Sequence, residues 1–486
     1  MIAPEQRTSR SIRIGELDRV LDRDPDDATA RSERAGLLRE AGRFEEAKSD
    51  YLELLRRQPT DFGALNDFGT LVLNAGYREA ARSLFAQAVR HHPRNPNGHV
   101  NLGNLLLLLG ECAPARHHFE TALRIDPGHV HAHRGLGNLF AAQGDEMSAR
   151  RHRDLGFRND FLTPLPYRGE GQGIAVLLLV AAAGGNIPVQ ALLDDRHFRT
   201  TVLVTEYYDA KSALPPHDVV FNSIGEADLC REGLEAARAV LARTSRPVIN
   251  HPARVLQTGR FSNAERLRGL PNVVVPRMMP MPRHVLAAPG GADAVAGNGF
   301  AFPLLVRAPG FHTGHHFVRV AAPDDLAAAV ANFPGDDVWL IEELDARDGE
   351  GMFRKFRVMF VDGGLYPLHL AISPHWKVHY FTADMTQSEA NRRCDAAFLA
   401  DMAGVIGPRG MAALERINGA LGLDYGGIDF AVNGNGDVLF FEANATMVVL
   451  PPSADAKWAY RRPAVAKVQS AVRAILSKRS LADNAA

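Results

Sequence analysis

Two carboxylates and one amide in the stretch 426–447 have the types and spacing of an oxygen-ligand site. Two apolar runs flank an Asn-Gly-Asn-Gly sequence at 433–436, which predicts a β-hairpin because asparagine and glycine readily adopt the positive φ angles of tight turns. Side chains alternate along each strand. A two-residue loop would therefore place Asp429 on the same face as Glu442 and Asn444, whereas a three-residue loop would turn it to the other face.

Three oxygen donors on one face suit a hard cation such as Mg²⁺, which proteins usually hold with one or two carboxylates plus phosphate oxygens. The alternative is a solvated acidic face. We disfavour it because an ionised Glu442 inside the apolar run 438–443 is costly unless something pairs with it. We therefore predict a metal site at Asp429, Glu442 and Asn444.

Arg307 and the glycine-containing loop after it could bind phosphate. Arg307 lies in a predicted strand, 302–308, and Arg260 opens a predicted helix. A guanidinium carries a permanent charge and can bind oxygens bidentately, and backbone N–H groups of a glycine-containing loop can cradle anions. The loop after the strand contains Gly310, Thr313 and Gly314. The structural alternatives are a common glycine-containing hairpin and a solvent-facing Arg260.

Taken in chain order, these features resemble the ATP-grasp superfamily, which includes D-alanine–D-alanine ligase, glutathione synthetase and the ligase that adds glutamate to a ribosomal protein. The resemblance covers residues 173–455. It implies that Asp429, Glu442 and Asn444 hold Mg²⁺ and that ATP binds beside them. The nucleotide-binding residues that it implies are Arg260, Arg307, Gly310, Thr313, Gly314, Glu342, Glu343 and Leu344.

The resemblance also implies catalytic roles for Arg357 and Arg307. Arg357 matches an arginine that in several relatives faces the transferred phosphoryl group or the acceptor carboxylate. Two residues depart from the family pattern. Arg307 stands where the family has lysine, and Lys355 stands near where many relatives carry an acid for the ribose.

A separate group of basic residues matches no family motif that we know. His375, Lys377 and His379 alternate along a predicted strand, 372–381, and would share one face of it. Acceptor binding or acid–base work is one interpretation. A surface strand is an equal alternative.

The first third of the chain repeats every 34 residues, which is the period of the tetratricopeptide repeat, a pair of antiparallel helices. The repeating positions are Pro25, Pro59, Pro93 and Pro127; Gly42, Gly76, Gly110 and Gly144; Ala47, Ala81, Ala115 and Ala149; and Ala35, Gly69, Gly103 and Gly137. We predict four repeats after a leading helix at 12–23. Arg153 replaces the expected phenylalanine in the fourth repeat, as in a capping unit.

Such a solenoid presents a concave groove. Four residues on the inner helices could hydrogen-bond a peptide backbone or form ordinary polar surface, namely Asn66, Thr70, Asn104 and Asn138. Histidines cluster at 91–92, 117–118 and 129–133. Their spacings do not share a helix face, so we predict solvated surface rather than a metal site.

The fold that we predict is multidomain: an all-α tetratricopeptide solenoid, an α/β leading domain and an α+β ATP-grasp domain. Strands at 174–180, 201–205, 219–222 and 247–250 alternate with helices at 189–193 and 229–242, which favours a parallel sheet. The divisions are a leading helix (1–24), repeats (25–157), a linker (158–172), the leading domain (173–270), the catalytic domain (271–460) and a C-terminal helix and tail (461–486).

Composition limits the partners. The 486 residues carry a net charge of −1, which gives no reason to expect nucleic acid or an anionic membrane. The three cysteines lie far apart and fit a reducing compartment. The longest apolar run, 175–183, is too short to span a bilayer, and the polar first residues do not predict a signal peptide. We expect a cytoplasmic protein.

The function implied is ATP-dependent ligation of a carboxylate to an amine through an acyl phosphate, on a peptide or protein substrate held by the repeats. A partner-binding scaffold with a vestigial nucleotide site is one alternative. A small-molecule kinase on the same fold is another.

Overall fold

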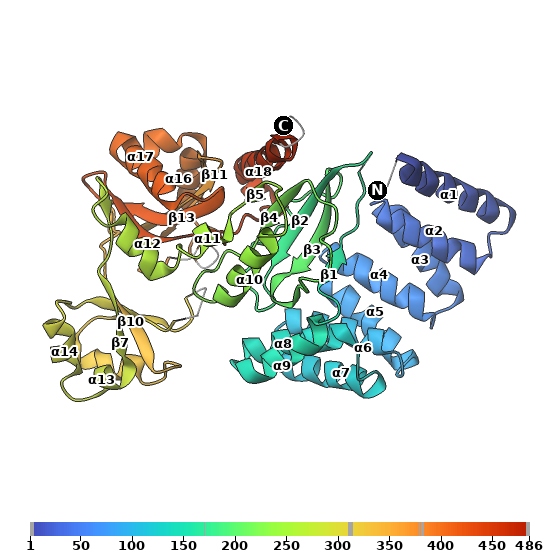
Figure 1. The fold of residues 1–486 in the computed structure, drawn as a ribbon, viewed down its shortest axis with the longest axis horizontal. Helices are drawn as coiled ribbons and strands as arrows, with labels where there is room; N and C mark the ends of the chain where they lie inside the picture. Colours follow the sequence, from blue (N-terminus) through green and yellow to red (C-terminus); the bar gives the residue numbers. More distant parts are fainter. Residues whose placement is uncertain (1–3, 170, 310–313, 379, 381–382, 483–486) are drawn as a thin grey trace. The chain divides into compact units, whose positions relative to one another are not determined.

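The computed structural model describes residues 4–169, 171–309, 314–378, 380 and 383–482 (Figure 1). The chain forms two compact units. The first contains Met1–Leu178 and Leu193–Asp218, and the second contains Leu179–Leu192 and Val219–Ala486. None of the helices in the described part of the chain combines the length and the apolar content that crossing a bilayer requires.

The first unit begins with α1 (Pro4–Arg23) and continues as four helix pairs (Figure 1). The pairs are α2 (Ala28–Glu40) with α3 (Phe44–Arg57), α4 (Phe62–Asn74) with α5 (Arg78–His91), α6 (Pro96–Leu108) with α7 (Cys112–Ile125), and α8 (Val130–Ala142) with α9 (Glu146–Phe157). The first helix of each pair starts 34 residues after the previous one, so the predicted period is confirmed.

The small and special residues of the repeat act as predicted. The four turn glycines have φ between +74° and +91°, a conformation that glycine adopts without strain. Gly69 lets two helices approach closely, because a Cβ there would lie 2.6 Å from Cε1 of Phe85. Arg153 takes the place of the aromatic residue and remains buried, donating to Oε1 of Glu146 at 2.6 Å.

A five-stranded sheet follows the repeats, with strand order β1-β3-β2-β4-β5. Its strands are β1 (Leu162–Pro164), β2 (Ile174–Val180), β3 (Phe198–Val204), β4 (Val219–Asn222) and β5 (Val248–Ile249). β1 lies within the range predicted as a linker and pairs antiparallel with β3. β4 and β5 are parallel. The boundary between the two units passes through β2.

The helix predicted at 229–242 is α10 (Arg231–Leu241). The helix predicted at 189–193 is wrong, since this stretch forms turns. Five residues are too few to repay helix nucleation without supporting contacts.

The second unit contains a four-stranded antiparallel sheet with strand order β7-β10-β8-β9. Its strands are β7 (Met278–Pro282), β8 (Leu304–Arg307), β9 (Phe317–Val320) and β10 (Asp337–Glu342), and the short helices beside them are α13 (Arg283–Ala287), α14 (Gly291–Gly297) and α15 (Leu326–Val330). β8 and β9 form a hairpin in which Arg307 pairs with Phe317. Buried apolar residues such as Val306, Val330 and Leu340 form the core.

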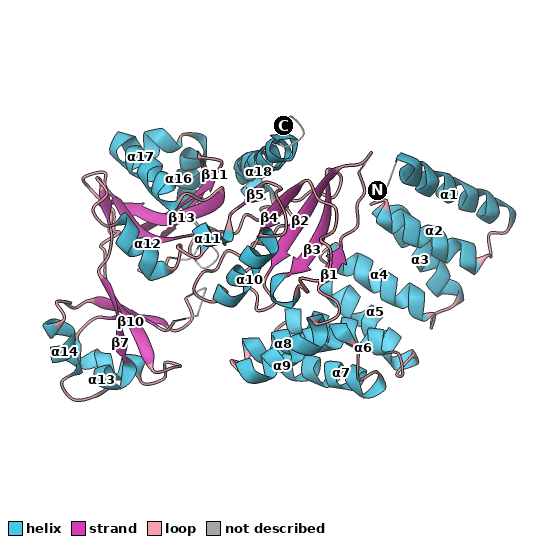
Figure 2. Ribbon diagram, in the orientation of Figure 1, coloured by secondary structure: helices cyan, strands magenta, loops and turns pink. Residues whose placement is uncertain are grey.

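The second unit also contains a five-stranded sheet with strand order β12-β11-β13-β14-β6. Two of its strands, β11 and β13, are labelled in Figure 2. Its strands are β6 (Val273–Val274), β11 (Phe353–Val361), β12 (Gly364–Ser373), β13 (Tyr425–Val432) and β14 (Val438–Asn444), and helices α12 (Arg260–Leu267), α16 (Glu389–Ala400), α17 (Met402–Leu421) and α18 (Arg462–Ala482) contact it. Phe356 packs against Phe430 and Phe398, with ring centroids 5.4 and 5.1 Å apart.

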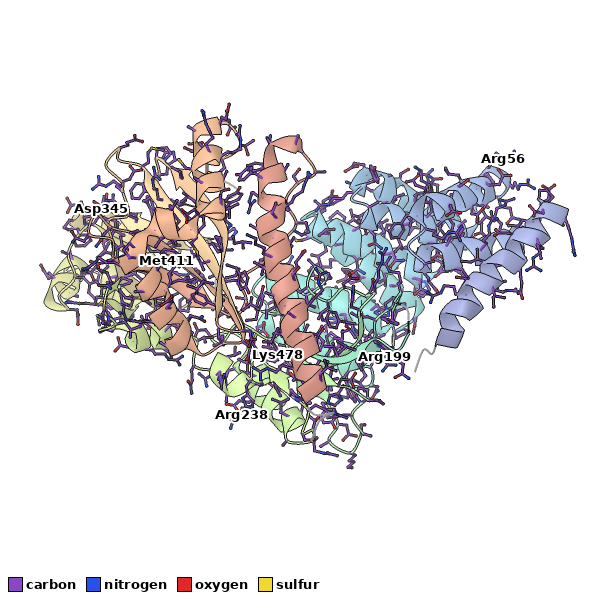
Figure 3. All side chains as sticks on the ribbon, turned by 90° about the horizontal axis from the view of Figure 1, so that it is seen from above. Arg56, Arg199, Arg238, Asp345, Met411 and Lys478 are labelled. Carbon is purple, nitrogen blue, oxygen red and sulfur yellow. The ribbon has the colours of Figure 1, made fainter. Side chains whose placement is uncertain are left out.

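α17 begins at Met402 and bends at Gly407, whose φ is +78°, directly before Pro408. The strand predicted at 372–381 ends at Ser373 as β12. The predicted basic C-terminal helix is α18, a long helix on which Lys478 is labelled in Figure 3. It buries apolar residues such as Val468 and Leu476 and is therefore packed.

Candidate functional site

Four polar residues stand side by side across four neighbouring strands of the β12-β11-β13-β14-β6 sheet. His369 on β12 pairs with Arg357 on β11, which pairs with Asp429 on β13, which pairs with Glu442 on β14. Directly paired residues point to the same face of a sheet. The sheet thus carries a transverse row of two carboxylates, a guanidinium and an imidazole.

A β-bulge puts Asp429 opposite Glu442. The hairpin loop contains five residues, 433–437, and Val432 pairs with Val438. Continued without interruption, this register would place Asp429 opposite Phe441. The register shifts between Asp429 and Phe430, so Phe441 becomes the extra residue and Glu442 meets Asp429. The predicted common face is confirmed, but neither of the two loop lengths considered is present.

Asp429 is held by two cations. Arg357 donates from Nε to Oδ1 at 2.6 Å and from Nη2 to Oδ2 at 2.8 Å, and Nζ of Lys355 lies 3.0 Å from Oδ2. The Asp429 residue is only 4% exposed. Burial by itself would raise the pKa of this carboxyl, but Arg357 and Lys355 outweigh it and hold the pKa well below its usual range. Lys355 therefore belongs to the site.

Glu442 is bound by Arg260 and Asn444. Nη2 of Arg260 donates to Oε1 at 2.7 Å, and Nδ2 of Asn444 lies 3.2 Å from the same oxygen. Burial opposes ionisation of Glu442, whereas Arg260 and Arg307 favour it, and the net effect lowers its pKa. The backbone N–H of Arg260 donates to Oδ2 of Asp228 at 3.1 Å, so a carboxylate holds the first turn of α12 at the site.

Arg307 completes the cationic group from the β8–β9 hairpin. Its Cζ lies 5.4 Å from the centre of the Phe317 ring. Burial and the neighbouring charge of Arg260 lower the pKa of Arg307 to about 10, while Glu442 acts in the opposite direction. Arg307 and Arg260 repel each other in a partly buried environment, and an anion that binds between them would stabilise both.

Glu226 is a site residue that the sequence analysis missed. It is 9% exposed and follows β4. Burial, then Glu442 and Asp228, raise the pKa of Glu226 to about 7. A Cβ at Gly225 would lie 2.7 Å from Cγ2 of Thr446, so the loop packs closely on the end of β14. Its position after the carboxyl end of a parallel strand is the signal that could have identified it.

The other residues predicted to bind the nucleotide are Glu342, Glu343, Leu344, Thr313 and the glycines of the β8–β9 connection. Oε2 of Glu342 accepts from the backbone N–H of Arg277 at 2.9 Å, and Glu343 accepts from Nε of Arg319. Leu344 packs against a small apolar cluster beside the β13–β14 hairpin. Gly314 has φ of +76°. Gly310 and Thr313 lie outside the described residues.

The predicted strand face is wrong for His375 and Lys377, because β12 ends before them at Ser373. Nζ of Lys377 donates to the carbonyl oxygens of Gly314 and Phe317 at 2.5 and 3.2 Å. This lysine is thus bound to the β8–β9 connection. His379 lies outside the described residues.

The oxygen donors at the Glu442 end of the row suit Mg²⁺ better than those of Asp429. Within the described ranges, no cluster of three or more His, Cys, Asp or Glu residues is arranged to hold a metal ion. Both hydrogen bonds that Glu442 accepts in that part of the chain end on Oε1. Both Asp429 oxygens are engaged by Arg357 and Lys355. Glu442 and Asn444 therefore fit a hard cation, and Asp429 fits if it shares its oxygens.

In the repeats, the predicted groove residues differ in exposure. Asn104 and Asn138 are exposed, whereas Asn66 is half-buried and accepts from Nδ2 of Asn101 at 2.6 Å. Thr70 donates to the carbonyl oxygen of Asn66 at 3.0 Å. The prediction of solvated histidines is wrong for His133, which is buried.

Comparison with known proteins identifies the repeats. The tetratricopeptide repeat model matches residues 14–62, 66–115 and 109–150. Residues 14–150 are tetratricopeptide repeats. The mixed α/β region with its several sheets follows them, and the match to the repeat model ends at residue 150. The comparison with curated proteins gives no match.

Several solved structures are similar to the repeat region. MamA is 17% identical, with 32% of this chain and 94% of MamA covered and a TM-score of 0.29. PilF of Pseudomonas aeruginosa is 22% identical, with 31% and 69% covered and a TM-score of 0.29. YrrB, described as a repeat protein with an unusual peptide-binding site, is 20% identical, with 32% and 79% covered and a TM-score of 0.27.

Proposed function

We propose that this chain is an ATP-dependent carboxylate–amine ligase whose repeats bind a peptide or protein substrate. The observation that carries the proposal is the meeting of Asp429 and Glu442 with four cations from three separate segments: Arg260, Arg307, Arg357 and Lys355. Cations held beside these carboxylates, with Glu226 and Asp228 nearby, can bind anionic oxygens while the carboxylates bind a divalent ion. A polyphosphate with a bound divalent ion supplies the complementary charge.

The order of motifs along residues 173–455 resembles the ATP-grasp superfamily, and this resemblance favours ATP as the polyphosphate. Arg307 replaces the family lysine without loss of charge, and its planar guanidinium can bind two phosphate oxygens at once. Glu442 and Asn444, together with Asp429, would hold Mg²⁺. When bound, this ion would neutralise charge on the phosphates.

The residues of the chain would bind and orient the reactants. Arg260 and Arg307 would bind phosphate oxygens, and Arg357 would face the transferred phosphoryl group, held in place by Asp429. The substrate carboxylate oxygen bonds to the γ-phosphorus as the bond to ADP breaks, which gives an acyl phosphate. The neutral amine nitrogen then bonds to the acyl carbon, inorganic phosphate leaves as the carbon–oxygen bond breaks, and the nitrogen loses one proton to solvent. Phosphoryl transfer requires positioning and charge neutralisation above all.

The repeats would raise the local concentration of the substrate. A solenoid presents an extended concave surface, and Asn104 and Asn138 are exposed at equivalent positions of two successive repeats. An amide side chain has both a donor and an acceptor for an extended peptide backbone. Recruitment of this kind acts through effective concentration and leaves the chemistry unchanged.

One observation favours a partner-binding scaffold as the second candidate. Arg357 and Lys355 already neutralise Asp429, so this carboxylate is satisfied without any ligand. In a scaffold, the row of charged residues would stabilise the sheet and nothing more.

Calorimetric titration with ATP and Mg²⁺, followed by product analysis, separates the two candidates. We expect binding that requires both components. Incubation with ATP, Mg²⁺ and a panel of amino acids and short peptides should then release ADP and give a product lighter than the sum of its parts by one water. A phosphorylated product would identify a kinase. Absence of binding would reject the ligase.

A further inference from the structure

Two pairs of histidines in the repeats share one geometry. Nδ1 of His99 lies 3.0 Å from Nδ1 of His118, and Nδ1 of His133 lies 2.9 Å from Nδ1 of His152. His99 and His133 lie on α6 and α8, whereas His118 and His152 lie on α7 and α9. Each pair therefore joins the two helices of one repeat, the third or the fourth.

The backbone contacts fix the tautomers. Nε2 of His99 lies 3.0 Å from the carbonyl oxygen of Pro93, and Nε2 of His133 lies 3.1 Å from that of Pro127. A carbonyl oxygen can only accept, so each Nε2 carries the proton. A neutral imidazole has one N–H, and Nδ1 of His99 must then accept from Nδ1–H of His118.

This arrangement limits how many protons a pair can bind. A proton added to Nε2 of His118 leaves its Nδ1–H bond to His99 intact. A second proton would have to enter at Nδ1 of His99, where two N–H groups would then face each other. The folded pair therefore holds one added proton at most, whereas the same two residues hold two in the unfolded chain.

The surroundings also oppose protonation. Burial, followed by the charges of His99 and His117, lowers the pKa of His118 to about 4. Burial also lowers the pKa of His152. The charged groups that act on His152 are His133, Arg151 and Arg116, which lower its pKa further, and Glu120, which raises it. The Phe140 ring stacks on His152, with centroids 5.5 Å apart.

We propose that the two histidine pairs make the third and fourth repeats a pH-sensitive segment of the solenoid. In their neutral form the pairs hold α6 to α7 and α8 to α9. Acid loosens both repeats because the unfolded segment binds more protons. α6 and α8 also carry the exposed Asn104 and Asn138, so a partner bound in the groove would be released in acid.

The chain contains its own control. The equivalent positions, 34 and 68 residues earlier, hold Leu65 and Leu84 in the second repeat and Arg31 and Asp50 in the first. Arg31 and Asp50 form an ion pair, with Nη1 and Oδ1 3.2 Å apart. The leucines show that the repeat accepts an apolar pair at these positions, and an apolar pair has nothing to titrate.

The test is hydrogen exchange of the full chain at pH 7 and pH 5, read helix by helix and corrected for the intrinsic exchange rate. Stability from His118 is present above pH 6.5 and is lost as pH falls toward 4. Between pH 7 and 5, this residue alone should raise the opening constant of α6 and α7 about 20-fold. His99→Leu/His118→Leu should abolish the change in these helices and leave that in α8 and α9.

The reciprocal variant, His133→Leu/His152→Leu, should protect α8 and α9 alone. His91→Leu, at an exposed position on α5, should behave as wild type. Equal acid sensitivity in the wild type and both pair variants would overturn the proposal. If a leucine variant fails to fold, ring NMR signals of the wild-type chain, with His118 assigned by His118→Gln, provide the test. Titration of His118 near 6.5 would overturn the proposal, and titration near 4 would support it.

Discussion

Asp429 and Glu442 lie directly opposite each other because β14 contains one more residue than β13 between the hairpin loop and this pair. The extra residue, Phe441, absorbs the odd parity of the five-residue loop. If Phe441 paired with Asp429 in a regular ladder, Glu442 would lie on the opposite face from Asp429 and Arg357. The bulge therefore places Glu442 on the same face of the sheet as Asp429 and Arg357.

Deletion of Phe441 should remove the bulge and keep the carboxylate pair, because Glu442 would then follow Phe440 directly and meet Asp429 in an uninterrupted ladder. Deletion of Phe440 and Phe441 together should instead place Glu442 opposite Phe430, on the other face of the sheet, where it loses Arg260. We expect calorimetry to detect binding of ATP with Mg²⁺ in the single deletion and no binding in the double deletion. Equal affinity in both variants would show that nucleotide binding does not depend on the row.

Glu442→Gln should weaken the dependence on Mg²⁺ because it removes one anionic oxygen donor from a set with only two. Loss of a partner to a metal ligand typically costs about 10–100-fold in affinity or activity, and loss of a direct ligand should cost at least as much. The measurement is ATP affinity as a function of Mg²⁺ concentration. Glu265→Gln is the control, since Glu265 pairs with Arg268 on the exposed side of α12. Unchanged Mg²⁺ dependence in Glu442→Gln would refute the metal assignment.

Arg307→Ala should lower the affinity for ATP strongly, whereas Arg307→Lys should retain much of it, since the ammonium keeps the charge. Truncating one partner of a buried charge pair costs about 2–5 kcal/mol. Arg307→Met should also raise the melting temperature of the ligand-free protein. The lowered pKa means that folding disfavours this cation, and at pH 7 the cost is present in full. A fall in both melting temperature and affinity for all three variants would indicate a structural role.

Gly103→Ala should destabilise the repeats by about 1–3 kcal/mol, the usual cost of overpacking. A Cβ at this position would lie 2.8 Å from Cε1 of Phe119. Gly36→Ala on α2 is the matched control, because no atom lies within 4 Å of the added Cβ. That variant should gain roughly 0.5–1 kcal/mol from the better helix propensity of alanine. Urea unfolding followed by circular dichroism measures both.

The sequence by itself determined the repeats and most of the strands. The 34-residue period fixes where each helix starts because turn glycines, capping residues and small contact residues act locally, within one repeat or between neighbours. Strands β2 and β4 have the predicted bounds since a short apolar run between turn residues is itself a local signal. The helix at 189–193 and the strand to residue 381 failed because their ends depend on contacts distant in the chain.

Only the tertiary structure decided what the polar residues contact. The pairing of Asp429 with Arg357 and Lys355, the position of Glu226 beside Glu442, and the burial of His133 all join residues from different segments. A single bulge at Phe441 determines whether the two carboxylates share a face. A phenylalanine at that position does not predict a bulge. Local patterns specify elements because their cause is local, whereas register, burial and ion pairing arise from packing among elements and are fixed only when the chain has folded.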